Sequence, residues 1–281
     1  MPASPSSSAQ SAREALAVRL RDLMLDARIT ARELALRCGW AESKTSRILN
    51  ARRPASEADI RAWCSACGVE DQAEDLIAAN RAVDSMYVQW KRLHRSGLRR
   101  IHETTVPLYA RTRNFRVYCS NVVPGLLQTR EYATALLSAI TSFQGTPDDV
   151  AEAVDARLAR SRVIREGDHR FSLLVEESVL RHRIGSAETM AGQLGSLLEV
   201  MALPRVSLGV IPFSASRRMW TLETFMLFDE AEVQVELLTA EVKVTAPSEI
   251  AVYARAFGEL ADMAVVGRPA RALITAAIDA L

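Results

Sequence analysis

Four polar side chains on one side of a short predicted helix have the chemistry to read DNA bases. They recur at helical spacing, and the apolar positions between them form a narrow stripe on the opposite side. Arginine can bond guanine bidentately, asparagine can do the same with adenine, and serine or lysine can reach phosphates and base edges. The residues that we predict to contact DNA are Thr30, Ser43, Lys44, Ser46, Arg47, Asn50, Arg52 and Arg53.

Two short helices joined by a glycine turn must position these side chains. Thr30 is a good N-cap, and Glu33 three residues later completes a capping box. The first helix should stop at Gly39, a residue suited to the left-handed C-terminal position. The second helix starts near Ala41, where the absence of a Ser or Thr cap should cost about 1 kcal/mol. Flanking amphipathic helices are predicted over residues 14–27 and 56–68.

This pattern resembles the repressor-type helix-turn-helix of the xenobiotic-response-element (XRE) class over about residues 16–69. The matching segments are ITARELA, RCGW, SKTSRIL and ARRPAS. Two positions depart from the class. Ala31 stands where a phosphate-binding Gln is common, which would weaken one backbone contact, and Ala51 replaces the usual Gly after the recognition helix, which would alter the turn.

Length and composition favour an ordinary globular protein of two domains. The 281 residues are 49% hydrophobic and 25% charged. No apolar run approaches the roughly 20 residues needed to span a bilayer. Residues 1–12 lack the basic start and apolar core of a secretory signal and read as a short disordered tail. The four cysteines should then be reduced thiols, and we expect a cytoplasmic location.

Charge is unevenly distributed although the net charge is only +1. Residues 13–68 carry 11 Lys or Arg and 7 Asp or Glu, a balance of +4. Residues 81–130 carry 10 and 2, a balance of +8, whereas residues 223–262 carry 2 and 9, a balance of −7. Such asymmetry is typical of a basic surface for nucleic acid with an acidic surface elsewhere. The alternative is that the charges merely solvate exposed faces.

The sequence offers no strong metal, cofactor or catalytic signature. Cys64 and Cys67 form a CxxC, but no second CxxC or His pair follows at ligand spacing, so packing in a helix is favoured over a thiol switch with Cys38. Glu176 and Glu177 should point to opposite faces at a strand end and cannot share one substrate. We therefore predict no cofactor, no metal and no enzymatic activity.

Beyond the first domain the pattern predicts a helical linker and a larger α+β domain. Residues 71–100 read as a long helix with a basic end, KRLHRSGLRR, which could bind DNA phosphates or an acidic surface. The remaining domain boundaries are 13–69 for the helix-turn-helix, 70–105 for the linker and 106–281 for the α+β domain. Predicted strands are 115–119, 171–175, 206–212, 224–228 and 233–238, and predicted helices are 147–165, 186–203, 247–266 and 269–281. A mixed sheet packed by helices should result.

The second domain contains segments that resemble a large actinobacterial family, the WhiJ-like regulators. The most specific is VPGLLQT, which follows a strand and precedes a helix capped by Thr129. Residues 174–213 and the helix VYARAFGELADMAV match as well, so the resemblance runs from about residue 16 to residue 265. It implies an XRE-type DNA-binding domain joined to a domain of unknown function. It also implies an antitoxin-like arrangement with a small partner protein from a neighbouring gene.

Three functional hypotheses follow. The first is a sequence-specific DNA-binding repressor, homodimeric on two half-sites about 34 Å apart and controlled by a small partner protein. The second replaces the partner by a small molecule bound between sheet and helices of the second domain. The third is an interaction protein that no longer binds DNA, which the alanines at positions 31, 41 and 51 would favour. The loop SASRRMW, residues 214–220, could belong to a ligand or partner pocket or be a plain surface loop.

Overall fold

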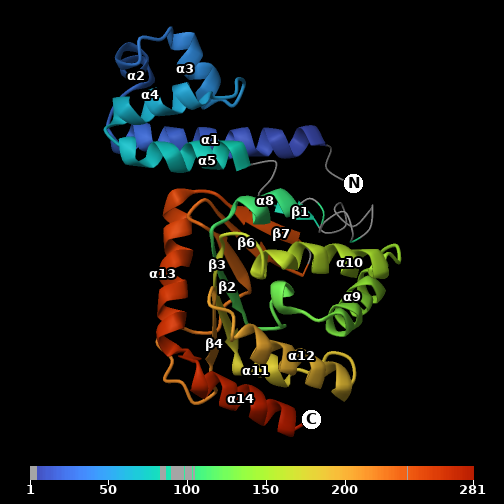
Figure 1. Cartoon of the computed structure of the whole chain (residues 1–281). Coiled ribbons are helices and arrows are strands. Elements are labelled where there is room, and N and C mark those ends of the chain that lie inside the picture. The colour runs from blue at the N-terminus through green and yellow to red at the C-terminus, as the bar shows by residue number, and fades with distance from the viewer. Residues whose placement is uncertain (1–4, 83–86, 90–97, 99–102, 104, 239) are drawn as a thin grey trace. The chain divides into compact units, whose positions relative to one another are not determined.

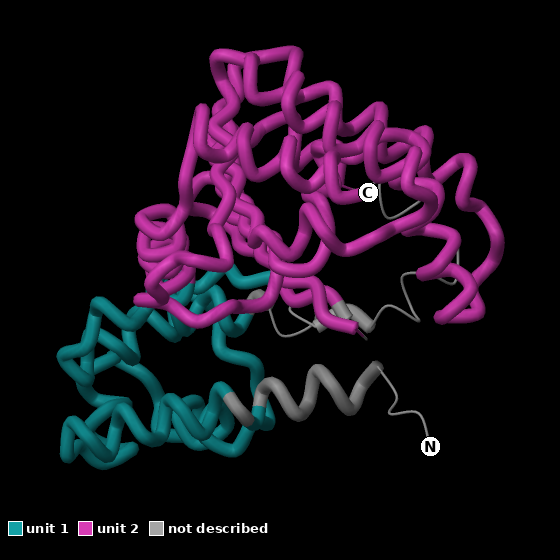
Figure 2. Tube along the Cα trace, turned by 90° about the horizontal axis from the view of Figure 1, so that it is seen from below, with its two compact units in different colours: residues 1–87, 243–249 teal, residues 88–242, 250–281 magenta. Residues whose placement is uncertain are grey.

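The chain consists of two compact units. The computed structural model describes residues 5–82, 87–89, 98, 103, 105–238 and 240–281. Unit 1 comprises Met1–Tyr87 with Lys243–Glu249, and unit 2 comprises Val88–Val242 with Ile250–Leu281 (Figure 2). The fold class predicted from the sequence, a helical region followed by an α+β region with a mixed sheet, is confirmed.

Unit 1 is built from helices. They are α1 (Pro5–Asp26), α2 (Ala31–Arg37), α3 (Glu42–Leu49), α4 (Glu57–Cys67), the short 3₁₀ helix η1 (Glu70–Gln72) and α5 (Ala73–Ala82) (Figure 1). Their shared core contains the fully buried side chains of Leu20, Leu34, Ile60 and Trp63. The Trp63 indole donates a 3.0 Å hydrogen bond to the Leu20 carbonyl, so its one polar atom is satisfied inside the core.

The ends of unit 1 differ from the predicted boundaries. Helix α1 begins at Pro5, a residue favoured in the first helical turn, and so overlaps the tail predicted for residues 1–12. Helix α5 packs into the unit 1 core through Leu76 and Ile77. The long helix predicted over residues 71–100 is wrong in part, because α5 ends at Ala82 and residues 87–89 form a strand. Apart from Leu98, its basic end lies outside the described residues.

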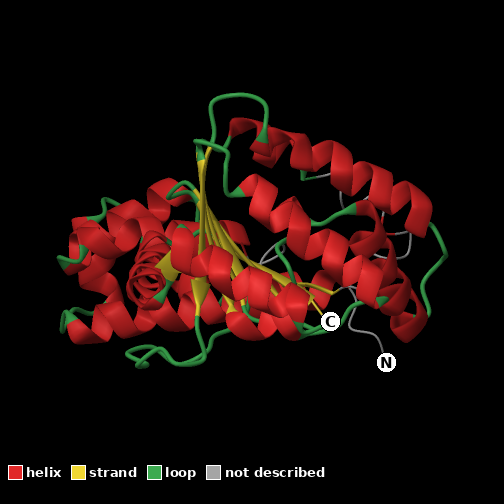
Figure 3. Cartoon of the chain, turned by 60° about the horizontal axis from the view of Figure 1, so that its bottom comes forward, coloured by secondary structure: helices red, strands yellow, loops and turns green. Residues whose placement is uncertain are grey.

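Within the described residues, a mixed sheet of eight strands organises unit 2 (Figure 3). The spatial order is β1-β7-β6-β5-β2-β3-β4-β8. The central strands β2, β3 and β4 are parallel, while β5, β6 and β8 join by antiparallel pairing. Strand bounds are β1 (Tyr87–Gln89), β2 (Asn114–Cys119), β3 (Arg170–Glu176), β4 (Val206–Ile211), β5 (Phe225–Phe228), β6 (Glu232–Glu236), β7 (Ala240–Val244) and β8 (Val265–Val266).

Alternate residues of β2 face different helical layers. Phe115, Val117 and Cys119 enter a large core together with buried residues of helices α9, α12 and α14. Tyr118 points to the other face, where its ring lies 5.5 Å from that of Phe225. The bounds are α8 (Val106–Arg111), η3 (Gly125–Leu127), α9 (Arg130–Gln144), α10 (Val150–Ser161), η4 (Arg162–Ile164), α11 (Glu177–Arg181), α12 (Ala187–Val200), α13 (Pro247–Met263) and α14 (Arg268–Asp279).

Capping residues account for four of the helix starts that the sequence predicts, those of α2, α4, α9 and α12. Thr129 and Ser186 accept hydrogen bonds from the third residue of α9 and α12, as N-caps should. All five predicted strands of the second domain are present within two residues of their expected bounds. The short elements β7, β8, α8 and α11 are additions to the predicted set.

Candidate nucleic-acid interface

Helix α3 is held by a buried stripe and presents the opposite face to solvent. Thr45 and Ile48 are fully buried against the unit 1 core, and Leu49 is partly buried. On the other side Ser43, Ser46, Arg47 and Asn50 are all exposed. The structure therefore brings these four predicted side chains together on one helical surface.

Two of these exposed side chains are bonded back to the preceding turn of α3. The Arg47 Nε donates to the Ser43 carbonyl at 3.0 Å, and its Nη2 lies 3.3 Å from the Ser43 hydroxyl. The Asn50 amide donates to the Ser46 carbonyl at 2.7 Å. Each pair spans four residues, so the two bonds repeat along the same face. The arginine and asparagine are thus partly ordered before any ligand arrives.

Lys44 occupies a different environment from its neighbours. Its ammonium lies 2.5 Å from the Asp59 carboxylate at the start of α4 and 3.9 Å from the centre of the Trp40 ring. Asp59 also completes a capping box with Ser56. Burial alone would raise the pKa of Asp59, but hydrogen bonds from Lys44 and Ser56 outweigh it and hold the pKa below its usual value. This lysine therefore joins α3 to α4.

The ends of α2 and α3 match the expected cap pattern in part, because the Glu33 carboxylate pairs with Arg37 instead of completing the predicted capping box with Thr30. Thr30 is exposed, and its hydroxyl accepts a 3.2 Å bond from the Glu33 amide at the start of α2. Gly39 adopts a φ of 67°, the left-handed conformation expected after α2. At the start of α3, Ala41 provides no side-chain cap. The backbone N–H groups in the first turn of α3 therefore have no side-chain acceptor, and water or a phosphate oxygen can accept hydrogen bonds from them.

The segment after α3 is strained at the alanine singled out in the sequence. Ala51 has a φ of 53°, in the left-handed region that favours glycine, and its side chain is buried. Arg52 and Arg53 follow it and are exposed. Their backbone amides both bond to the Arg47 carbonyl, at 2.9 and 3.2 Å. This turn keeps two guanidinium side chains immediately next to the end of α3.

The three cysteines of unit 1 are free thiols. Burial, followed by the charge on Cys67, raises the pKa of Cys64 to about 11, and burial also raises the pKa of Cys38 and Cys67. Thiols with raised pKa values are poor nucleophiles at neutral pH. Within the described part of the chain, no group of three His, Cys, Asp or Glu residues could hold a metal ion.

The paired glutamates of unit 2 have separate structural partners. Glu176 accepts a 2.8 Å bond from the Tyr118 hydroxyl and is bound by both terminal nitrogens of Arg217. Glu177 instead pairs with Arg181 at 2.9 Å and accepts a 2.9 Å bond from the Phe213 amide. The two carboxylates thus do not form a common site, and Arg217 anchors the SASRRMW loop through Glu176.

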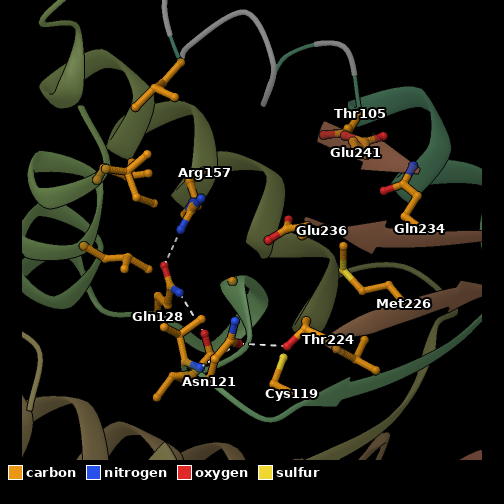
Figure 4. Close-up of a pocket in the computed structure, with 18 of the residues that line it drawn as sticks. Thr105, Cys119, Asn121, Gln128, Arg157, Thr224, Met226, Gln234, Glu236 and Glu241 are labelled. Carbon is orange, nitrogen blue, oxygen red and sulfur yellow. Dashed lines mark hydrogen bonds between the residues drawn. The ribbon is translucent and has the colours of Figure 1, made fainter. Parts of the chain in front are cut away.

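A cavity of about 440 Å³ is present in unit 2 between the sheet and helices α9 and α10 (Figure 4). The VPGLLQT segment contributes part of its wall through Val123, Gly125 and Gln128. The side-chain amide nitrogen of Gln128 donates a 2.7 Å hydrogen bond to the Val123 carbonyl. The side-chain oxygen of Gln128 accepts a hydrogen bond from Arg157 of α10. The most specific sequence segment of the second domain therefore helps to position a cavity side chain.

Family comparisons agree with these two structural regions. A helical unit with an exposed α3 defines the helix-turn-helix class, and residues 15–76 match a family described as Helix-turn-helix domain. Residues 103–276 match a family described as Domain of unknown function (DUF5753). Because this second match covers more than half of the sequence, the chain belongs to the DUF5753 family.

The helix-turn-helix match indicates a DNA-binding regulator, a class that is typically not enzymatic. No curated protein and no solved structure matches the chain. None of the described helices combines the length and the apolar character required to cross a membrane.

Sequence reasoning finds the α3 face and suggests a pocket between the sheet and helices of the second domain, but it does not identify the residues that line the cavity. The α3 residues lie within one turn or two of each other, so helical periodicity is enough to group them. The cavity side chains Gln128, Arg157 and Glu236 come from three distant segments, and each alone reads as an ordinary surface polar residue. The one sequence signal that points to the cavity is VPGLLQT, which carries no catalytic chemistry by itself.

Proposed function

We propose that this protein is a sequence-specific DNA-binding transcriptional regulator that reads bases with the exposed face of α3. The observation that carries the proposal is the grouping of Ser43, Ser46, Arg47 and Asn50 opposite the buried Thr45–Ile48 side. Among them Arg47 and Asn50 carry the donor groups that can pair with guanine and adenine in the major groove. Ser43 and Ser46 would add contacts to phosphates or base edges.

Three further predicted residues would act on the phosphate backbone. Arg52 and Arg53 are exposed beyond the end of α3, and Thr30 is exposed at the start of α2. Contacts of this kind fix the register of a helix in the groove without selecting sequence. Lys44 is better assigned to holding α3 against α4, because its ammonium already has the Asp59 carboxylate as a partner. We therefore propose that the residues that contact bases, which we call the reading set, are Ser43, Ser46, Arg47 and Asn50, without Lys44.

The proposed DNA-binding form is a homodimer. A single recognition helix contacts only a few base pairs, and two copies on half-sites about 34 Å apart are the usual way to obtain affinity and specificity. We assign the dimer contacts to unit 2. Size-exclusion chromatography with light scattering, with and without a palindromic duplex, would distinguish a dimer from a monomer.

The input to this regulator has two candidate sources. The cavity of unit 2 favours a small molecule, because about 440 Å³ lies within the range of roughly 300–1,000 Å³ typical of ligand sites. The resemblance to WhiJ-like regulators supports an antitoxin-like repressor controlled by a small partner protein. Co-expression with the product of any short neighbouring gene, followed by co-purification, tests the second source independently of the first.

DNA binding is tested by selecting duplexes from a random pool with the full chain. Enrichment of a defined motif is the expected result, and its affinity is then measured for the wild type, Arg47→Ala and Arg61→Ala. The control Arg61 is an exposed arginine on α4 that pairs with Glu74 rather than lying on α3. Arg47→Ala should lose roughly 1–3 kcal/mol and relax selectivity at one base pair.

Two results would contradict the proposal in different ways. Failure to enrich any motif, together with no salt-dependent binding to random duplex, would favour the third hypothesis of a pure interaction protein. A motif bound equally well by wild type and Arg47→Ala would keep the regulator but remove Arg47 from the reading set.

A further inference from the structure

The unit 2 cavity has positive and negative charges on different walls. Arg157 and Arg160 extend from α10, whereas Glu236 and Glu241 belong to strands β6 and β7. Figure 4 shows Arg157 and Glu236 entering the cavity from these separate walls. The formal charges of these four residues balance, so a ligand with a single charge would be attracted by one wall and repelled by the other. A ligand with both a positive and a negative group would be attracted by both walls.

The positive wall has donors without acceptors. The Arg157 Nη1 is bonded to Gln128, and the Arg160 Nη1 donates 2.8 Å to Thr105 while its guanidinium lies 4.5 Å from the Tyr109 ring centre. The Nε atoms of both arginines are buried and have no hydrogen-bond partner among the described residues. For Arg157 this leaves Nη2, which has no hydrogen bond to the described residues and is not among the buried atoms, as the donor that a ligand carboxylate can reach.

Electrostatics supports an anionic group at this wall. Burial, and then the neighbouring charge of Arg160, lower the pKa of Arg157 to about 10. Two adjacent guanidinium groups that are partly withdrawn from water repel each other, and an anion between them offsets this repulsion. The carboxamide of Gln128 is a neutral acceptor and compensates for only part of this cost. A bound carboxylate would restore the charge pairing that the protein itself does not supply at Arg157.

The negative wall offers the complementary group. Glu236 lines the cavity and is exposed. It is nevertheless close enough to Arg157 to influence its titration. A ligand ammonium beside Glu236 would therefore be attracted locally, while the ligand's own anion would shield it from the arginines.

Between the charged walls the cavity is apolar. Leu136, Leu137 and Ile140 of α9 line it, together with Val122 and Val123. These side chains cannot bond a polar ligand edge, so they favour a hydrocarbon side chain. The cavity thus combines a carboxylate position, an ammonium position and an apolar surface.

We propose that the cavity binds a small zwitterion of the amino-acid or short-peptide class, with its carboxylate on Arg157 and Arg160 and its ammonium on Glu236. The ligand's apolar side chain packs against α9. This inference rests on the proposed ligand-sensing role of unit 2 and names the chemistry of the signal. VPGLLQT acquires a role as well, since its Gln128 holds Arg157 in the cavity.

The test is direct binding to the purified full chain in the absence of DNA. Thermal-shift assays and calorimetry are run with the twenty standard amino acids and a set of leucine-containing dipeptides, each at up to millimolar concentration. At least one apolar member should bind. Its methyl ester lacks the anion and its N-acetyl form lacks the cation, so each should bind at least about tenfold more weakly, equivalent to about 1.4 kcal/mol.

Two variants locate the ligand. Arg157→Gln and Glu236→Gln should each weaken binding by about tenfold or more, whereas the controls Arg165→Gln and Glu230→Gln should leave it unchanged. Arg165 and Glu230 are exposed and do not line the cavity. Circular dichroism verifies folding, and Glu236→Gln remains informative if Arg157→Gln unfolds because Glu236 is exposed.

Three outcomes would overturn the proposal. These are no binding by any member of the panel, equal binding of the ester or N-acetyl form, and equal binding by the cavity variants and their controls. The effect of a confirmed ligand on operator affinity is measured separately. Binding without any change in DNA affinity would refute the sensory role while leaving the site intact, and failure of DNA binding would leave the ligand measurement unaffected.

Discussion

The Lys44 ammonium and the Asp59 carboxylate lie 2.5 Å apart, so one side chain of α3 is fixed to the first turn of α4. Asp59 simultaneously accepts a 3.2 Å bond from the Ser56 amide, and Ser56 returns a cap to the Asp59 amide. Lys44 and the capping box therefore form one hydrogen-bonded network. This network sets the orientation of α3, which carries the proposed reading face, relative to α4.

Replacing Lys44 by Met should destabilise unit 1 in a pH-dependent way. Above about pH 4, close to the ordinary pKa of an aspartate in an unfolded chain, Asp59 is ionised and the variant should lose about 1–2 kcal/mol. The folded-state pKa of Asp59 is lowered, so this contribution is present above the unfolded pKa and disappears as pH falls through the folded pKa. Urea unfolding from pH 3 to pH 7 measures the difference.

The matched control for that measurement is Arg61→Met. Arg61 pairs with Glu74 on the surface of the same unit, and both side chains are about half exposed. An exposed pair of this kind should leave unfolding almost unchanged at every pH. A stability loss for Lys44→Met that is identical at pH 3 and pH 7 would show that packing on Trp40, rather than the charge on Asp59, is responsible.

Ala51→Gly should stabilise the protein. A φ of 53° costs an L-residue roughly 1–2 kcal/mol, a penalty that glycine avoids. Glycine loses more chain entropy on folding, and the buried Ala51 methyl group is removed, so the expected net gain is only about 0.5 kcal/mol. Chemical denaturation gives the value. Ala55→Gly, a buried alanine without a positive φ, is the control and should destabilise.

Thr45→Val should also stabilise unit 1. The Thr45 side chain is fully buried, and its hydroxyl oxygen has no hydrogen-bond partner among the described residues. Valine keeps the shape and removes an unsatisfied polar atom, for which the expected gain is about 1 kcal/mol. Thermal unfolding compares it with Thr30→Val, which removes the α2 cap and should destabilise. A destabilised Thr45→Val would indicate a hydroxyl partner in solution.

Sequence predicts the parts of this molecule that depend on local rules. The helix starts at Thr30 and Thr129 follow from capping residues, and the exposed face of α3 follows from periodicity. The partnership of Lys44 has no such local signal. Its charge suggests a DNA contact, but Asp59 lies fifteen positions further along the chain and meets it only after α3 and α4 pack.

Tertiary placement also decides what the second domain contains. The strands follow from β-branched and aromatic content, whereas the order of β5, β2 and β3 in the sheet has no local signal. Gln128 and Arg157 are 29 positions apart, and Glu236 joins them only through the strand order. Sites assembled across a sheet and two helices therefore need the fold before their chemistry can be recognised.

Arg52 and Arg53 should govern the salt dependence of DNA binding more than its selectivity. Both are exposed beyond α3, where phosphate contacts would release counterions from the duplex. Each Arg→Ala substitution should reduce the slope of log K against log salt by about 1 and weaken selected and random duplexes similarly. Fluorescence anisotropy across a salt series measures both quantities. Arg47→Ala should instead weaken the selected duplex preferentially, and a reversal of these two patterns would exchange the proposed roles of the α3 face and the turn that follows it.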